Sequence, residues 1–382
     1  MNDIIPRPAF QKRIEQAFTI TPIVTLLGPR QCGKTTLARI IAQHTTATVY
    51  DLEDPADDVA LANPMLALGG KSGLIVIDEV QRRPELFPIL RVLVDKPDNK
   101  TRFLLLGSAS PALVRGVSET LAGRTSFVDM HGFSLQEVDN SAWQKLWLRG
   151  GFPRSFLAAS DEASLEWRKG FIRTFLERDI PQLGMSIPAP ALTRFWTMIA
   201  HYHGQVWNGS VLARSLGISD KTVRRYLDIL EGTFIVRMLL PWYENTGKRL
   251  VKSPKVYIRD SGILHALLGI GDLDSLLSHP VVGASWEGYA IETLLARFPG
   301  AEAYFYGTHS GAEIDLLLLY KNKRYGFEIK LNQAPSMTRS MQSALEDLHL
   351  DELFVIYPGT KTYPIAPQVT AVPVWQPLLD SV

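Results

Sequence analysis

A glycine-rich stretch near the amino end combines a lysine with two hydroxyl side chains. Residues 28–35 read Gly-Pro-Arg-Gln-Cys-Gly-Lys-Thr and match the pattern G-x-x-x-x-G-K-[ST] in full. In such a loop the backbone N–H groups surround phosphates, the lysine reaches the β and γ oxygens, and the hydroxyl ligates Mg²⁺. The sequence therefore predicts a site for ATP and Mg²⁺ formed by Gly28, Pro29, Arg30, Gln31, Cys32, Gly33, Lys34, Thr35 and Thr36.

Two acidic residues end an apolar segment and could complete a hydrolytic site. The segment "GLIVIDEV" contains Asp78 and Glu79. Asp78 is predicted to hold Mg²⁺ together with Thr35, and Glu79 to polarise the attacking water. Ser108 in "FLLLGSAS" is a further candidate for contact with the γ-phosphate or its water, as is Ser110. A serine-rich turn without a catalytic role is the alternative for either one.

Phosphoryl transfer also needs a cation that faces the developing negative charge. Arg124 in "LAGRTSF" and Arg178 in "FLERDI" are the candidates, and either could instead form an ordinary surface ion pair. If one of them acts on a neighbouring copy, the protein must form a homo-oligomer to turn over.

A second group of charged residues, near the carboxyl end, could hold a metal beside a phosphodiester. Asp315 lies in one expected strand, and "FEIK" puts Glu328 and Lys330 two residues apart in the next one. Residues two apart share a face of a strand, so these side chains can point toward the same place. The two carboxylates are predicted to bind Mg²⁺, with Glu287 as a further ligand, while Lys330 orients or activates a water. Strands with charged outer faces give the same pattern without catalysis.

The elements that must position these residues predict an α/β fold. Short apolar runs alternate with helical patterns at the amino end, which is typical of a parallel sheet covered by helices. The expected strands are Ile23–Leu27, Thr48–Leu52, Leu74–Asp78, Phe103–Leu106 and Ser126–Met130. The expected domains are an ATPase core over 1–140, a helical lid or linker over 141–204, a winged helix over 205–270, and an α/β domain around the second carboxylate group over 280–382.

The chain's excess of positive over negative charge is concentrated in the expected winged helix. Between Ser210 and Asp260 ten lysines and arginines face five acidic residues, a local net charge of +5 in a chain whose total is +1. A helix ended by Gly217 is followed by one capped by Ser219, and two strands come after them. Basic side chains on the second helix (Lys221, Arg224 and Arg225) are predicted to contact the DNA backbone. A lid or a dock for a protein is the alternative.

Length and composition bound the remaining possibilities. The chain has 382 residues and is 46% hydrophobic, which favours several folded domains. The single cysteine cannot form an internal disulfide, and there is no stretch typical of a signal peptide or a membrane span. The sequence therefore favours a cytoplasmic protein with no membrane partner.

The motifs and their order resemble those of a large prokaryotic family of AAA+ ATPases. The likeness rests on "LLGPRQCGKTT", "VYDLEDP", "LIVIDEVQRRPELFPILRVLVD", "FLLLGSAS", "LAGR", "GGFPRSF" and "FLERDI". It implies a P-loop NTPase parallel sheet (AAA+), then a winged-helix unit, then a restriction-endonuclease-like α/β domain. It also implies that Gln81 relays between the nucleotide and a partner. Asp315 and Glu328-x-Lys330 resemble the PD-(D/E)XK nuclease pattern, although Ile314 replaces its proline.

Three functions remain open at this point. The first is an Mg²⁺-dependent ATPase that couples nucleotide binding and hydrolysis to the binding, remodelling or cleavage of branched or broken DNA. The second is a nucleotide-gated switch that docks a protein partner through an inactive nuclease-like domain. The third is a DNA-binding regulator without nuclease activity.

Overall fold

The computed structural model describes residues 4–108, 111–182, 187–243, 250–309, 311–332 and 334–376. The chain divides into two compact units. The amino-terminal unit consists of Met1–Gly132 with Gly232–Phe234, and the carboxyl-terminal unit consists of Phe133–Glu231 with Ile235–Val382. Within the described residues, no helix combines the length and the apolar character needed to cross a membrane.

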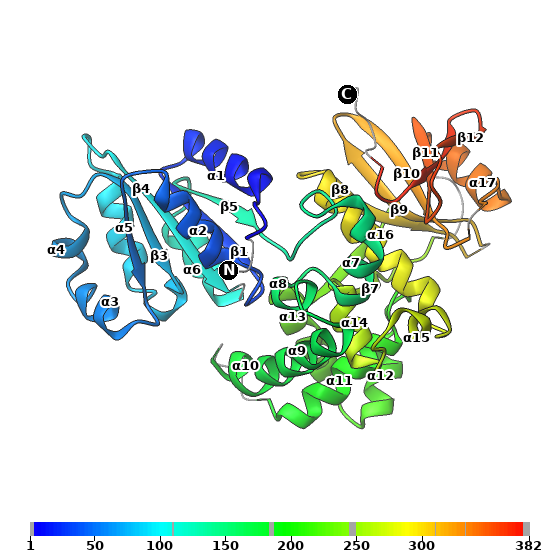
Figure 1. The fold of residues 1–382 in the computed structure, drawn as a ribbon, viewed down its shortest axis with the longest axis horizontal. Coiled ribbons are helices and arrows are strands. Elements are labelled where there is room, and N and C mark those ends of the chain that lie inside the picture. Colours follow the sequence, from blue (N-terminus) through cyan, green and yellow to red (C-terminus); the bar gives the residue numbers. More distant parts are fainter. Residues whose placement is uncertain are drawn as a thin grey trace. The chain divides into compact units, whose positions relative to one another are not determined.

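The amino-terminal unit is built on a five-stranded sheet in the order β2-β3-β4-β1-β5 (Figure 1). All neighbouring strands run parallel. All five predicted strands are present, with ends that differ by at most two residues from the prediction. The strands are β1 (Ile23–Gly28), β2 (Ala47–Asp51), β3 (Gly73–Asp78), β4 (Thr101–Ser108) and β5 (Thr125–Asp129).

Helices cover this sheet because its strands are apolar on both faces. Every residue of β1 is buried, as are the last five of β3. A buried cluster joins Ile75 and Phe103 of the sheet to Leu90 of α5 and Val117 of α6, while α1 and α2 contact the strands outside this cluster. The helices are α1 (Pro8–Ile20), α2 (Lys34–Gln43), α3 (Pro55–Ala60), α4 (Pro64–Leu68), η1 (Val80–Arg82), α5 (Leu86–Val94) and α6 (Pro111–Thr120).

The carboxyl-terminal unit begins with helices, as predicted for 141–204. A π-helical turn, η3, falls within the segment "FLERDI". The helices of this unit are η2 (Asn140–Ala142), α7 (Trp143–Arg149), α8 (Pro153–Phe156), α9 (Asp161–Thr174), η3 (Phe175–Asp179), α10 (Ile180–Gln182), α11 (Ala189–His201), α12 (Gly209–Leu216), α13 (Asp220–Gly232), α14 (Ser261–Leu267), α15 (Leu273–Leu277), α16 (Val282–Arg297) and α17 (Arg339–Leu348).

An eight-stranded mixed sheet follows, in the order β12-β13-β11-β10-β9-β8-β6-β7. The hairpin of β6 and β7, expected as the wing of a separate domain, continues this sheet because β6 pairs with β8 at Leu240 and Pro241. The boundaries of the four expected domains stay a prediction. The strands are β6 (Val236–Pro241), β7 (Lys255–Ile258), β8 (Glu302–Gly307), β9 (Glu313–Tyr320), β10 (Lys323–Ile329), β11 (Glu352–Tyr357), β12 (Tyr363–Ala366) and β13 (Val369–Pro373).

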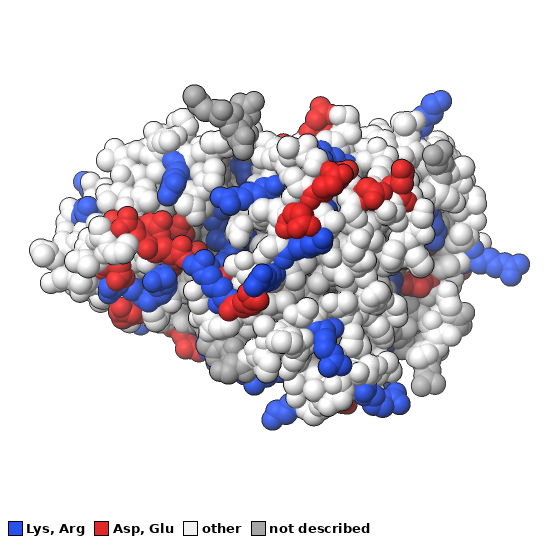
Figure 2. All heavy atoms as spheres, turned by 60° about the horizontal axis from the view of Figure 1, so that its bottom comes forward, with Lys and Arg blue, Asp and Glu red and all other residues white. Residues whose placement is uncertain are grey.

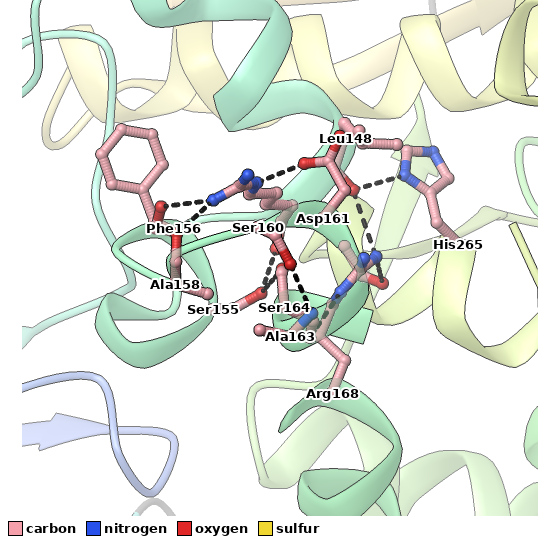
Figure 3. A network of polar contacts seen from close by, with 12 residues as sticks. Leu148, Ser155, Phe156, Ala158, Ser160, Asp161, Ala163, Ser164, Arg168 and His265 are labelled. Atoms are coloured by element: carbon pink, nitrogen blue, oxygen red, sulfur yellow. Dashed lines mark hydrogen bonds and ion pairs between the residues drawn. The ribbon is translucent and has the colours of Figure 1, made fainter. Parts of the chain in front are cut away.

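A buried polar network ties the helices of this unit together (Figure 3). The fully buried guanidinium of Arg168 donates to the carbonyl oxygens of Ser164, Leu148 and Gly262. Burial lowers the pKa of Arg168 to about 10. The ring of His265 lies against the same Leu148 carbonyl, at 2.9 Å from Nδ1. Hydrogen bonds offset the cost of burying polar groups, so these contacts help to hold α7, α9 and α14 together, although Arg168 Nη2 has no hydrogen-bond partner among the described residues.

Candidate nucleotide site and carboxylate cluster

The glycine-rich loop joins the end of β1 to the start of α2, the strand–loop–helix context that a phosphate cradle requires. Gly28 packs against backbone, since a β-carbon there would lie 2.2 Å from the carbonyl oxygen of Met130. Gly33 has a φ of 102° and Gln31 a φ of 62°. These left-handed conformations curl the loop back over the first turn of α2, whose N–H groups carry the positive end of the helix dipole.

The predicted lysine, hydroxyl and first carboxylate lie together at this loop. Lys34 is buried, and its Nζ donates to the carbonyl oxygens of Gly28 at 3.0 Å and Pro29 at 2.9 Å. Thr35 Oγ1 donates to Asp78 Oδ2 at 2.6 Å. Burial raises the pKa of Asp78, and the hydrogen bond from Thr35 opposes that rise.

Glu79 occupies a strained position directly after β3. Its φ of 54° and ψ of 41° lie in the left-handed region that a side chain with a β-carbon seldom adopts. Its Oε2 accepts a hydrogen bond from the amide of Gln81 and lies 3.9 Å from Nη2 of Arg30. Burial raises the pKa of Glu79, with Arg30 and Lys34 opposing the rise. A carboxyl group with a raised pKa is a better acceptor for the proton of an attacking water.

The end of β4 contributes a buried hydroxyl on the same sheet edge. Ser108 pairs in register with Gly28 of β1. Its Oγ is buried and has no hydrogen-bond partner among the described residues. A buried hydroxyl without a partner is costly, which fits a role as a contact for a bound ligand. Ser110, the other candidate serine, lies outside the described residues.

Arg7 is a functional candidate that the sequence analysis missed. It is only 5% exposed, and its guanidinium donates to the carbonyl oxygens of Cys32, His131 and Gly132. It therefore fixes the middle of the glycine-rich loop from the chain segment before α1. No local pattern marks an isolated arginine followed by proline, so only the tertiary structure reveals this contact.

Arg124 lies away from the loop of its own chain. It precedes β5, and the residue after it pairs with Ile23 at the start of β1, so it belongs to the amino ends of the strands. The loop lies at their carboxyl ends. Two of the Arg124 nitrogens donate to the carboxylate of Asp95, at 2.6 and 2.8 Å. Within one chain this is the ion pair that the alternative interpretation expected, and a role on a neighbouring copy stays a prediction. Arg178 is exposed on the π turn.

The residues of this edge fit a nucleotide and Mg²⁺. A close-packed Gly28, the Thr35–Asp78 pair and the partnerless Ser108 hydroxyl lie at adjacent strand ends. Bound Mg²⁺ would neutralise part of the negative charge of the phosphates. Lys34 would contact the phosphates, Thr35 and Asp78 would hold the metal, and Glu79 would take a proton from water.

The second group of predicted residues also comes together. β9 and β10 are antiparallel, and their last registered pair is Leu316 with Phe327, so Asp315 and Glu328 come next on facing strands. Lys330 Nζ lies 2.6 Å from Glu328 Oε1. Burial raises the pKa of both carboxyl groups. For Asp315 the charges of Glu287 and Glu328 add to the rise, while Lys330 opposes it for Glu328.

One of the ten basic residues counted in the local charge of 210–260 lies inside this cluster. Lys255 is only 5% exposed. Its Nζ lies 3.1 Å from Glu287, 2.6 Å from Glu313 and 3.8 Å from Asp315. Within the described ranges, no group of three or more acidic, His or Cys side chains could hold a metal ion. Lys255 thus occupies the space beside Glu287 and Asp315 that the Mg²⁺ predicted for Glu287, Asp315 and Glu328 would need.

Other basic residues of the predicted DNA-binding region also form ion pairs with acidic side chains. Arg237 and Arg259 both pair with Glu292, and Arg224 Nε lies 2.8 Å from Asp228 Oδ1. Lys248 and Arg249 lie outside the described residues. The face in Figure 2 shows Lys and Arg side chains beside Asp and Glu side chains rather than a broad area of one sign.

The helix pair α12 and α13 forms as predicted. Gly217 ends α12 in a left-handed conformation, with a φ of 68°. The Ser219 hydroxyl accepts from the Thr222 N–H, and Lys221 and Arg225 are exposed. Arg224 lines a groove of about 480 Å³ with Trp207, Asn208, Gly209, Ser210, Asp220 and Ser253.

The parallel sheet with its glycine-rich loop and adjacent acid pair defines a P-loop ATPase. Comparison with known families agrees, because an "AAA domain" family matches residues 21–139. Two families described as domains of unknown function, DUF8612 and DUF4143, match residues 140–274 and 282–376.

Relatives span most of the chain. The chain is 51% identical over 370 residues to "Uncharacterized protein Rv2008c" of Mycobacterium tuberculosis and to "Uncharacterized protein Mb2031c" of Mycobacterium bovis, covering 97% of this chain and 84% of each relative. The protein belongs to the family of these mycobacterial proteins, and its own AAA domain supports an AAA+ ATPase. A solved structure, the "walker-type atpase paby2304" of Pyrococcus abyssi, has a similar fold, with a TM-score of 0.52 and 16% identity over 70% of this chain and 96% of that one.

Proposed function

We propose that this protein is an Mg²⁺-dependent ATPase that works as a nucleotide-gated switch, with its carboxyl-terminal unit serving to bind a protein partner. The observation that carries the proposal is the restraint on Glu79. Its carboxylate is bound by Gln81 and faces Arg30, and its backbone is strained. Glu79 must leave these contacts before it can activate water. Ligand binding that releases Glu79 would therefore control the rate of hydrolysis.

The position of Lys34 supports the same conclusion. Its ammonium binds two carbonyl oxygens of its own loop, and phosphate oxygens would compete for it. Binding of a triphosphate would therefore exchange contacts within the loop for contacts to the ligand. Gln81 also lies against β4, because a β-carbon on Gly107 would be 2.9 Å from its Oε1. A change at Glu79 can thus reach the strand that carries Ser108.

The test compares ATP hydrolysis and nucleotide binding in matched variants. Glu79→Gln is expected to lower the hydrolysis rate by about 100-fold or more, as loss of a general base does, while ATP still binds. Glu85→Gln, which alters an exposed acid nearby, is the control and should keep the wild-type rate. Gln81→Ala removes the restraint and should raise the basal rate several-fold. Equal rates in wild type and Gln81→Ala would refute the gate while leaving the ATPase assignment intact.

Binding of DNA is the second candidate function, and the exposed side chains of α13 favour it. Lys221 and Arg225 project from this helix, and Arg224 lies at the groove beside Trp207. Lysines and arginines on one helix can contact successive phosphates without reading the bases. Cleavage of DNA is not part of this candidate, since the Lys255 ammonium lies among the carboxylates where a metal would bind.

Salt dependence separates DNA binding from the switch alone. Fluorescence anisotropy with linear, forked and junction DNA should show binding that weakens as salt rises. The triple variant Lys221→Ala, Arg224→Ala, Arg225→Ala should reduce the slope of log K against log salt by about 0.9 for each phosphate that the variant no longer neutralises. Lys96→Ala, at an exposed site in the amino-terminal unit, is the control. Absence of binding to every DNA at low salt would refute this candidate.

A further inference from the structure

The carboxylate cluster of the carboxyl-terminal unit contains a cation supplied by the chain itself. Lys255, the first residue of β7, directs its ammonium to carboxylates from α16 and β9. The contacts are 3.1 Å to Glu287 Oε1, 2.6 Å to Glu313 Oε1 and 3.8 Å to Asp315 Oδ1. The Phe305 ring lies on another side, with its centroid 5.5 Å from Nζ. The ammonium is thus enclosed by acidic oxygens and an aromatic face.

The backbone around Lys255 holds this side chain in place. Lys255 pairs with Leu239 of β6 and forms a bridge with Val206. Tyr257 lies two residues further on, on the same face of β7, and its hydroxyl donates to Glu287 at 2.5 Å. Two neighbouring side chains of one strand therefore bind the same carboxylate. Lys255 cannot leave the cluster without breaking strand pairing or turning its side chain out of a buried site.

An ammonium and a divalent metal compete for this position. Mg²⁺ binds carboxylate oxygens at about 2.0–2.1 Å, well inside the distances at which Lys255 holds them. Both cations would have to share the oxygens of Glu287 and Asp315 and would repel each other at short range. Glu328 Oε2 is buried and has no hydrogen-bond partner among the described residues, so this oxygen stays unpaired although Lys255 is present.

We propose that the Lys255 ammonium is the built-in cation of this cluster, taking the place of a divalent metal, and that its removal opens a metal site formed by Glu287, Asp315 and Glu328. The carboxylates then hold β7, α16 and β9 together rather than activating water at a phosphodiester. The inference concerns only this unit and does not depend on the proposed switch.

The decisive experiment measures Mn²⁺ binding to the full-length, nucleotide-free chain by electron paramagnetic resonance. Lys255→Met keeps the length of the side chain and removes its charge. It should gain one Mn²⁺ site that is at least tenfold tighter than any site of the wild type. Lys252→Met, at an exposed position in the same segment, is the matched control and should gain none. In Lys255→Met, the added change Asp315→Asn should abolish the new site.

A second measurement decides the question even if Lys255→Met does not fold. Asp315→Asn in the otherwise wild-type chain should leave Mn²⁺ binding unchanged, because Lys255 already fills the cluster. A loss of bound Mn²⁺ in that variant would overturn the proposal, since it would mean that the wild-type cluster takes the metal. A folded Lys255→Met that binds no more Mn²⁺ than the wild type would overturn it as well.

Discussion

Substitution of the buried His265 should weaken the carboxyl-terminal unit by an amount that depends on pH. The ring takes part in an ordered chain of hydrogen bonds: Trp147 Nε1 donates to the Ser285 hydroxyl at 2.9 Å, and that hydroxyl lies 2.7 Å from His265 Nε2. Since Nδ1 faces the Leu148 carbonyl, Nδ1 must donate and Nε2 must accept from Ser285. This arrangement requires the neutral ring.

The structure sets the size and sign of the effect. Burial, together with the nearby charge of Arg168, lowers the pKa of His265 to about 3 in the folded chain. The usual histidine pKa of about 6.5 applies when the chain is unfolded. At pH 7.5 neither state binds a proton at this ring, whereas at pH 5 only the unfolded state does. Protonation at pH 5 therefore favours unfolding by about 2 kcal/mol, because 1.36 kcal/mol corresponds to one pKa unit.

The variant His265→Gln has no imidazole to protonate. Comparing its stability with that of the wild type therefore measures the contribution of the His265 titration alone. Its loss of stability relative to the wild type should be smaller at pH 5 than at pH 7.5 by about 2 kcal/mol. Other buried groups, such as the carboxyl group of Asp260, titrate equally in both chains and cancel in the comparison. The control is His201→Gln, which replaces an exposed histidine and leaves the hydrogen bonds of His265 intact.

Tryptophan fluorescence during urea unfolding is the appropriate assay. All eight tryptophans lie in the carboxyl-terminal unit, so the signal reports the unfolding of that unit alone. A destabilisation by His265→Gln that is the same at both pH values would refute the argument, because it would mean that the folded chain protonates this ring as readily as the unfolded chain.

Three further substitutions test the packing around the two sites. Gly28→Ala places a β-carbon 2.2 Å from the Met130 carbonyl oxygen, and the forced shift should destabilise the amino-terminal unit by about 1–3 kcal/mol and weaken ATP binding in calorimetry. Arg7→Met removes the Arg7 hydrogen bonds to the buried Cys32 carbonyl and to two half-buried carbonyl groups, and should cost about 2–4 kcal/mol in thermal unfolding; an unchanged midpoint would contradict the proposed support of the loop. Gly288→Ala puts a β-carbon 2.4 Å from His203 Nε2, so the tryptophan-detected unfolding midpoint should fall to lower urea.

The nucleotide site could be predicted from the sequence because its parts are short and local. The glycine pattern, the apolar run of β1 and the amphipathic start of α2 are consecutive. Asp78 follows from a second apolar run that ends in acids. Parallel strands bring their carboxyl ends to one edge, so the sequence also indicated that Thr35 and Asp78 would meet. Asp315 and Glu328 were predictable for a similar reason, because a short turn joins their strands.

The partners of each charged side chain, in contrast, became visible only in the folded chain. Lys255 and Lys221 look alike in the sequence, yet one is buried among carboxylates and the other is exposed. The difference arises because β6 joins the carboxyl-terminal sheet through β8, which brings β7 next to residues far away in the chain. Arg7 likewise reaches its partners across more than a hundred residues. Periodicity reports which face of an element is buried, but it carries no information about which distant element covers that face.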